Sequence, residues 1–364
     1  MKKQPTYLIF HAYSDQDTGG IQTMIRLYAE EAHKNGATFI VLSDHRDVLA
    51  SGEQQLEHLT LLPLTWPSLL KCIFTPTRQA LCTFDPHNPY LIRMGLFKLL
   101  RPDTVTSLFF LGSTADTEGL LKSILLYLSP LFTNHFLALS DCVKQIAFKG
   151  KRQHRIQLCH NPVDTALYQP SALSGKQLVN ADRVVAGKNH VEMIQVFILA
   201  HAQDPELTLV IAGNYKKTSN PNENTESYKQ CQELLKEAGL ENQVTFTGNL
   251  SPTELRNLLT SSDIFLKTSL SETCGISTIE AMASGLPVIA FDNTGTHETV
   301  SRGNGILVRD HDVEQMAHAI IQLMRNRRSI EDMGLASLQG AVFYNRPRCI
   351  NVFFSTISSK IPSL

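Results

Sequence analysis

The amino-acid sequence predicts an α/β protein with two doubly wound, Rossmann-like parallel-sheet domains, and three observations lead to this prediction. The chain has 364 residues, which is too long for one ordinary core and suits two domains of usual size. Segments typical of strands and of helices alternate through both halves, as they do where helices cover parallel sheets. Residues 263–291 read as strand, loop, helix and strand, a unit that binds ligands at the carboxyl ends of its strands.

The first half contains six predicted strands separated by helix-like segments. The amino-terminal residues carry two lysines and then a short apolar run that soon meets polar residues, which predicts a first strand rather than a signal peptide. The most apolar later stretch, residues 120–139, is interrupted by Lys122 and Pro130 and does not suit a membrane span. We expect strands at residues 6–11, 37–43, 80–84, 104–111, 136–140 and 156–160.

The second half begins after a segment rich in proline and small polar residues, residues 160–176, which predicts a linker. The expected domains are therefore residues 1–165 and 166–345. We expect strands at residues 183–186, 207–213, 243–248 and 263–268, two more strands after Gly285, and helices at 189–202, 226–238, 252–260 and 312–325. A polar insertion occupies residues 218–227, and no internal repeat is present.

The composition limits the classes of function. Hydrophobic residues make up 43% of the chain and charged residues 18%, as in a soluble globular protein, and the formal net charge of -1 gives no sign of nucleic-acid binding. The seven cysteines are scattered and contain no CxxC pair, so neither a disulfide framework nor a zinc site is predicted, and a reducing cytoplasm fits best. They are Cys72, Cys82, Cys142, Cys159, Cys231, Cys274 and Cys349.

The segment SETCGISTIEAMASGLPV, which begins at Ser271, predicts a helix N-terminus suited to phosphate. Small residues at Gly275 and Ser277 let backbone N–H groups approach an anion, and the helix dipole adds partial positive charge. Glu272 precedes the helix and could reach a hydroxyl-rich group beyond a diphosphate, whereas Glu280 lies about one turn inside and could bind a ribose. The alternative is an ordinary helix of good helix formers that Ser271 or Thr273 caps.

The spacing of Glu272 and Glu280, followed by EAMASGLPV, resembles the signature of the retaining nucleotide-sugar glycosyltransferases of family four. The resemblance covers nearly the whole chain. It implies the GT-B fold, in which an acceptor-binding domain and a nucleotide-sugar domain face a cleft and the tail, residues 346–364, crosses back to the first domain. It also implies that Glu272 binds donor-sugar hydroxyls, Glu280 binds the ribose, and the amides of Gly275, Ile276 and Ser277 hold the diphosphate. Cys274 replaces the usual phenylalanine, which changes packing more than chemistry.

Two cations lie on either side of a predicted strand-to-helix turn. Arg183 and Lys188 flank Gly187, and Asn189 is placed to cap the following helix. Fixed cations at the carboxyl end of a strand would neutralise a diphosphate leaving group, and the resembled family has an arginine and a lysine at this spacing. Alternatively, both are solvated surface residues. Asp182 stands where the family often has glycine.

The first domain offers two weaker candidates. Gly19 and Gly20 follow the first strand, where the resembled family brings a glycine loop to the donor phosphate. His87 follows a later strand beside Asp85, which could orient its imidazole. The family's usual histidine after the next strand is absent, because that stretch reads LFFLGSTAD, so His87 is either its replacement or a turn histidine without a catalytic role.

Two further sequence patterns correspond to features of glycosyltransferases, a DxD sequence and the stretch NTGTHETV. Asp310 and Asp312 form a DxD sequence, which holds a divalent metal in another glycosyltransferase fold, but here it precedes a helix and predicts an N-cap. In the resembled family, the stretch with Gly295 and Glu298 closes the phosphate side of the site. Thr294 replaces the first glycine of the family's pair, so amide access there is expected to differ.

These observations predict a retaining glycosyltransferase that moves a sugar from a nucleoside diphosphate sugar, with UDP favoured, to a hydroxyl on a glycan, lipid-linked or protein acceptor in surface-glycan assembly. No cofactor and no metal are expected. The basic, apolar stretch of residues 91–101 either rests on an anionic membrane surface, which would make the protein peripheral on the inner face of the cell membrane, or is a helix packed on its own sheet. The alternative function is a non-catalytic scaffold or partner-stabilising subunit of the same fold.

Overall fold

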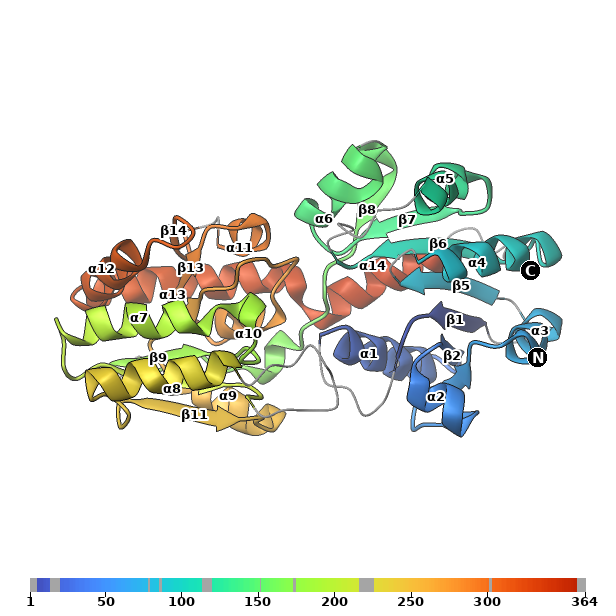
Figure 1. Ribbon diagram of the computed structural model, residues 1–364. Helices are drawn as coiled ribbons and strands as arrows, with labels where there is room; N and C mark the ends of the chain where they lie inside the picture. The colour runs from blue at the N-terminus through green and yellow to red at the C-terminus, as the bar shows by residue number, and fades with distance from the viewer. Residues whose placement is uncertain are drawn as a thin grey trace. The chain divides into compact units, whose positions relative to one another are not determined.

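The protein forms two compact units, each a sheet covered by helices (Figure 1). The computed structural model describes residues 5–13, 20–77, 79–84, 87–112, 120–150, 152–172, 175–215, 226–300 and 303–358. The first unit comprises Met1–Pro162 with Pro347–Leu364, and the second comprises Val163–Arg346. The predicted α/β class with two parallel-sheet units is confirmed.

The sheet of the first unit has the strand order β3-β4-β2-β1-β5-β6-β7-β8. All neighbouring strands run parallel except β3, which pairs antiparallel with β4. The strands are β1 (Thr6–Phe10), β2 (Thr38–Ser43), β3 (Gln54–Gln55), β4 (Thr60–Pro63), β5 (Gln79–Phe84), β6 (Val105–Phe110), β7 (His135–Ala138) and β8 (Ile156–Leu158). The helices are α1 (Gly20–Lys34), α2 (Arg46–Ser51), α3 (Trp66–Phe74), α4 (Asn88–Leu100), α5 (Leu120–Leu128), α6 (Asp141–Ile146) and α14 (Arg346–Ser358).

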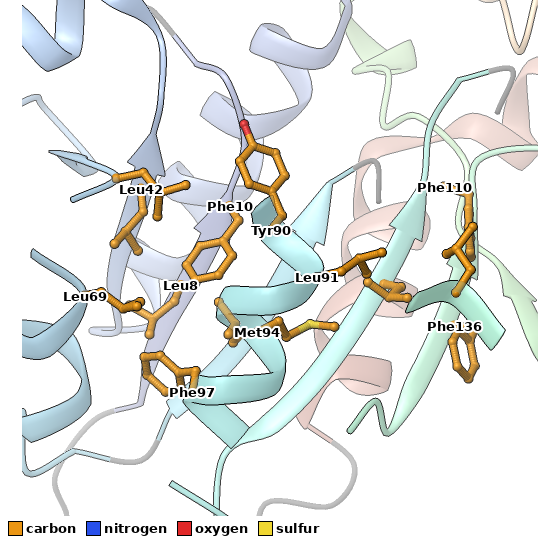
Figure 2. Close-up of a cluster of buried hydrophobic side chains, with 14 of the residues drawn as sticks. Leu8, Phe10, Leu42, Leu69, Tyr90, Leu91, Met94, Phe97, Phe110 and Phe136 are labelled. Atoms are coloured by element: carbon orange, nitrogen blue, oxygen red, sulfur yellow. The ribbon is translucent and has the colours of Figure 1, made fainter. Parts of the chain in front are cut away.

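The core of the first unit lies between the sheet and its helices. Figure 2 shows Leu8 and Phe10 of β1 beside side chains of α4. On α4, Tyr90, Met94 and Phe97 recur at helical spacing, so one face of this helix is buried. The chain's last helix, α14, completes the unit, because its Phe353 is fully buried and stacks on Tyr28 of α1 with ring centroids 4.0 Å apart.

The sheet of the second unit is wholly parallel, in the order β11-β10-β9-β12-β13-β14. Its strands are β9 (Gln177–Asn180), β10 (Thr208–Ala212), β11 (Val244–Gly248), β12 (Ile264–Lys267), β13 (Val288–Phe291) and β14 (Gly305–Val308). Its helices are α7 (His190–His201), α8 (Glu226–Ala238), α9 (Pro252–Thr260), α10 (Ile276–Ala283), α11 (Thr294–Thr299), α12 (Val313–Met324) and α13 (Arg327–Ala341). The strand order reverses between β9 and β12, and such a switch point is where doubly wound sheets bind ligands.

The first strand of this second unit lies earlier in the chain than predicted. This strand was predicted at residues 183–186. The residues that pair with β10 and β12 are instead those of β9, Gln177–Asn180. The apolar pair Val184 and Val185 instead follows the strand in a loop, where the Val184 amide donates to the carbonyl oxygen of Asn214 at 2.9 Å. Val184 is 1% exposed, and a buried loop needs apolar residues just as a buried strand does. The apolar residues of this loop therefore resembled those of a strand.

Some elements of both units were not predicted from the sequence. Strand β4 and helix α13 were not predicted, although α13 packs on α10. Among the helices of the described ranges, none combines the length and the apolar character needed to cross a bilayer.

Candidate functional site

The candidate site lies at the switch point of the second unit, where the loops after β9 and β12 meet. The hydroxyl of Thr268 donates to the Lys188 carbonyl oxygen at 3.1 Å, and the Leu270 amide donates to the Gly187 carbonyl oxygen at 3.1 Å. These bonds join the turn that carries Lys188 to the segment that leads to Glu272. Because β9 and β12 are neighbouring parallel strands, their carboxyl ends bring the two loops to the same edge of the sheet.

Four charged side chains form a cluster at this edge, which we call the charged cluster: Asp182, Lys188, Lys267 and Glu272. Lys188 and Lys267 both form ion pairs with Glu272, and the distance from Lys267 Nζ to Glu272 Oε1 is 2.7 Å. Lys267 also lies 2.7 Å from Asp182 Oδ2. The side chains of Lys267, Asp182 and Glu272 are 1%, 8% and 9% exposed, whereas that of Lys188 is 24% exposed. Lys188 is therefore the member that solvent or a ligand can reach most readily.

A second layer of hydrogen bonds fixes the carboxylate of Asp182. Asn180 Nδ2 donates to Asp182 Oδ2 at 3.0 Å, and Ser277 Oγ donates to Asp182 Oδ1 at 3.0 Å. Asn180 Oδ1 in turn lies 3.0 Å from Nε2 of the buried His190. Burial lowers the pKa of His190 to about 4, so its ring is neutral and bonds to Asn180 as a donor at neutral pH.

Asp182, Lys267 and Glu272 keep their charges although their side chains are almost fully buried. Burial would raise the pKa of Asp182 and of Glu272, but the charges of Lys267 and Lys188 outweigh it and hold both pKa values below their usual range. Burial would likewise lower the pKa of Lys267, yet the two carboxylates keep that pKa above its usual value. Two cations and two anions therefore compensate one another in a largely buried cluster in which Lys188 is the most exposed member.

Helix α10 begins beside the charged cluster with Gly275 at its N-cap. Gly275 has φ 62° and ψ 77°, a left-handed conformation that favours glycine, and no side chain caps the helix. The N-cap position is therefore Gly275 and not Ser271 or Thr273, the residues of the alternative. Ile276 is half-buried as the first helical residue, and the hydroxyl of Ser277 is engaged with Asp182. The uncapped backbone N–H groups of the first turn suit an anion.

Glu280, one turn into α10, is held by a residue that the sequence analysis did not single out. The hydroxyl of Tyr168 donates to Glu280 Oε1 at 2.7 Å. Burial raises the pKa of Glu280 to about 7, while the bond from Tyr168 opposes that rise. The pKa of Tyr168 is raised by its own burial and by the nearby carboxylate, so Tyr168 remains a donor at all ordinary pH values.

The remaining candidates of this unit lie around the same loops. Arg183 is exposed in the loop after β9. Asn189 occupies the N-cap position of α7 with φ 54° but makes no side-chain capping bond, so the predicted cap is wrong, because this left-handed backbone turns the residue away from the usual capping geometry. Gly295 of α11 packs against Glu272: a Cβ built there would lie 2.8 Å from Glu272 Cβ and would overlap its carbonyl group.

The DxD sequence has the structural role that was predicted. Asp312 is the N-cap of α12, and its Oδ1 accepts from the Gln315 amide at 2.9 Å. Asp310, the other acid of the DxD sequence, is not the N-cap residue, and burial raises its pKa. Within the described ranges, no three His, Cys, Asp or Glu side chains are grouped so that they could hold a metal ion, and none of the seven cysteines forms a disulfide.

The candidates of the first unit are placed only in part. Gly20 is the exposed first residue of α1, and His87 is exposed at the N-cap position of α4, where its ring packs edge-on to Tyr90 at 5.6 Å. They follow β1 and β5, which are neighbouring strands. Gly19 and Asp85 lie outside the described residues, as do residues 113–116 of the stretch that lacks the expected histidine.

Sequence reasoning missed Lys267 and Tyr168, and it noted Asp182 only as a departure from a pattern. A signal for Lys267 was available, because a lysine inside the buried strand IFLK needs a counter-ion. Tyr168 lies in a segment that was interpreted as linker, so nothing local indicated its contact with Glu280.

The sequence of the second unit is similar to the sequences of known glycosyltransferases. Residues 169–338 match the family model described as glycosyl transferases group 1. The D-inositol 3-phosphate glycosyltransferases of Mycobacterium tuberculosis and Mycobacterium bovis are 30% identical to this chain over 188 residues. These alignments cover 50% of this chain and only 38% of each mycobacterial protein.

Solved structures resemble the whole chain at low identity. Anabaena Alr3699/HepE in complex with UDP and glucose has a TM-score of 0.76 at 16% identity, over 97% of this chain and 99% of that one. A glycosyltransferase from Rickettsia africae has a TM-score of 0.77 at 16% identity, over 99% of this chain and 100% of that one. The expected GT-B fold is confirmed.

Proposed function

We propose that the protein transfers a sugar from a nucleoside diphosphate sugar to a hydroxyl acceptor, which is supported by the match of residues 169–338, within the second unit, to the family model of the group 1 glycosyl transferases. One observation carries the proposal: Lys188 and Glu272 meet at the switch point between β9 and β12, beside the uncapped start of α10. A cation, an acid and the N-terminal end of a helix at that position match the parts of a nucleotide sugar.

The donor is proposed to bind along the start of α10. The first-turn amides and Lys188 receive the diphosphate, Glu272 accepts from sugar hydroxyls, and Glu280 accepts from the ribose. UDP is the favoured nucleotide, which is supported by the UDP complexes of the Anabaena protein with the same fold. Arg183, exposed in the loop after β9, is the second cation offered to the diphosphate.

Transfer is proposed to proceed with retention at the anomeric carbon. The bond from that carbon to the diphosphate oxygen breaks, the acceptor oxygen bonds to the same face, and the departing diphosphate takes the acceptor's proton. Lys188 and Arg183 stabilise the charge that develops on the leaving group, which is electrostatic catalysis by fixed cations. Glu272 orients the sugar and does not attack it. Because the protein supplies the cations, the proposal requires no metal ion and no cofactor.

The proposed acceptor is a hydroxyl on a glycan, on a lipid-linked glycan or on a protein, in surface-glycan assembly at the inner face of the cell membrane. Support for membrane contact comes from α4, on which Ile92, Leu99 and Leu100 are 50%, 74% and 50% exposed. Its charges contribute less than the sequence suggested, because Lys98 donates to the carbonyl oxygens of Pro102 and Thr104. Liposome flotation tests this part of the proposal, and flotation independent of anionic lipid would reject electrostatic docking.

The test of catalysis is transfer or slow hydrolysis of UDP-, GDP- and ADP-sugars by the purified protein, with and without EDTA. Lys188→Ala and Arg183→Ala are each expected to lower turnover by about a hundredfold or more while the fold persists. Lys229→Ala, which removes an exposed lysine of α8, is the matched control. Turnover near the wild-type value in either site variant would reject the mechanism. A wild-type protein that binds nucleotide sugar but turns none over would favour the non-catalytic scaffold.

A further inference from the structure

Lys267 is the least expected member of the charged cluster. It ends β12 with a side chain that is 1% exposed, so its ammonium group has left water entirely. Its Nζ donates to both carboxylate oxygens of Asp182, at 2.8 and 2.7 Å, and lies 2.7 Å from Glu272 Oε1. A lysine buried to this degree is stable only with such partners. None of the roles assigned above to donor binding uses it.

Glu272 has two counter-ions that differ in access. Lys188 and Lys267 both bond to Glu272 Oε1, but the Lys188 side chain is 24% exposed and that of Lys267 is 1% exposed. A ligand can therefore compete for Lys188 and cannot compete for Lys267. With both lysines in place, the two cations of the charged cluster balance its two carboxylates.

This arrangement has a consequence when a diphosphate arrives. Without Lys267, Lys188 would be the only counter-ion of Glu272, whose side chain is 9% exposed, and it could not bind the diphosphate fully while it stayed on that carboxylate. Leaving a buried carboxylate without a counter-ion is costly, so a site with a single lysine would hold that lysine back. A second, permanent cation removes this penalty.

We propose that Lys267 is a positioning residue that stays on Glu272 as its permanent counter-ion and so releases Lys188 to the donor diphosphate. The inference rests on the proposed function and concerns the same site. It assigns the two lysines different tasks: one changes partner during binding, and the other keeps the sugar-binding carboxylate charged and in place.

The structure also explains why Lys267 cannot follow the ligand. Asp182 binds the Lys267 ammonium with both carboxylate oxygens, and Asn180 and Ser277 hold that carboxylate from β9 and α10. Ser277 Oγ further lies 3.3 Å from Lys267 Nζ. Residues of β9, α10 and the loop after β9 therefore hold the Lys267 ammonium group in place beside Glu272.

The test compares Lys267→Met with the double variant Asp182→Asn/Lys267→Met. Methionine keeps the length of the side chain without its charge, and the double variant also removes the carboxylate that would otherwise be stranded. Binding of UDP, GDP and ADP is measured by calorimetry, and binding of the matching nucleoside is measured by ligand-observed NMR. Lys229→Met on the exposed face of α8 is the control.

We expect Lys267→Met to weaken binding of the nucleoside diphosphate by about tenfold or more, the value of one charge-assisted hydrogen bond, and to leave nucleoside binding unchanged. The double variant is expected to fold at least as well as the single variant and to stay equally weak toward the diphosphate. Recovery of diphosphate affinity in the double variant would overturn the inference, because Lys267 would then serve only to neutralise Asp182. An equal loss for diphosphate and nucleoside would overturn it too. A wild-type protein that binds none of the three diphosphates would instead reject the proposed function on which the inference rests.

Discussion

Glu280 makes the stability of the second unit depend on pH in a direction that can be calculated. Its side chain is half-buried on α10 beside the Tyr168 hydroxyl, and this burial raises its pKa from 4.5 to about 7. The folded state therefore holds a proton on Glu280 over a pH range in which the unfolded chain has lost it. The stabilisation is complete below pH 4.5 and disappears as the pH rises through about 7.

The difference between the two pKa values corresponds to roughly 3 kcal/mol of unfolding free energy. Glu280→Gln cannot ionise and still accepts the bond from Tyr168, so it should not show this loss. The assay is urea unfolding of both proteins between pH 4.5 and 8. Over this range the unfolding free energy of the wild type should fall, relative to that of Glu280→Gln, by about the amount given above. Glu237→Gln, at an exposed position of α8, is the control and should leave the pH profile unchanged. Parallel profiles for wild type and Glu280→Gln would refute the reasoning.

Two further predictions concern packing. Gly295→Ala should destabilise the second unit by about 1–3 kcal/mol, because the new methyl group overlaps the Glu272 backbone. The control is Gly187→Ala, where a Cβ meets nothing within 4 Å. In thermal unfolding, only Gly295→Ala should lower the midpoint markedly. Phe353→Ala should cost the first unit about 3–5 kcal/mol in chemical denaturation, because it opens a cavity against Tyr28. Phe74→Ala, at a side chain that is 77% exposed, should change little, and an equal loss in both phenylalanine variants would contradict the assigned core.

The sequence was most informative where the signal is local. The spacing from Glu272 to Glu280 and the small residues between them predicted a loop that enters a helix, and the structure has α10 at that place. Asp312 was correctly predicted as an N-cap for the same reason, because a short polar side chain satisfies amides only a few residues away. Prediction was less accurate for the strand before Arg183, because burial of a loop residue and burial of a strand residue give the same apolar pattern.

By itself, the amino-acid sequence determined the alternation of strands and helices, the two-unit α/β architecture and the place where α10 begins. Only the tertiary structure decided which charges share a site. Lys267 and Asp182 lie 85 residues apart in the chain, and Tyr168 reaches Glu280 across 112 residues. Local propensity contains no information about such pairs, because they depend on which strands become neighbours in the sheet. The placement of β12 beside β9 joined the two loops, and burial there required that every charge find a partner.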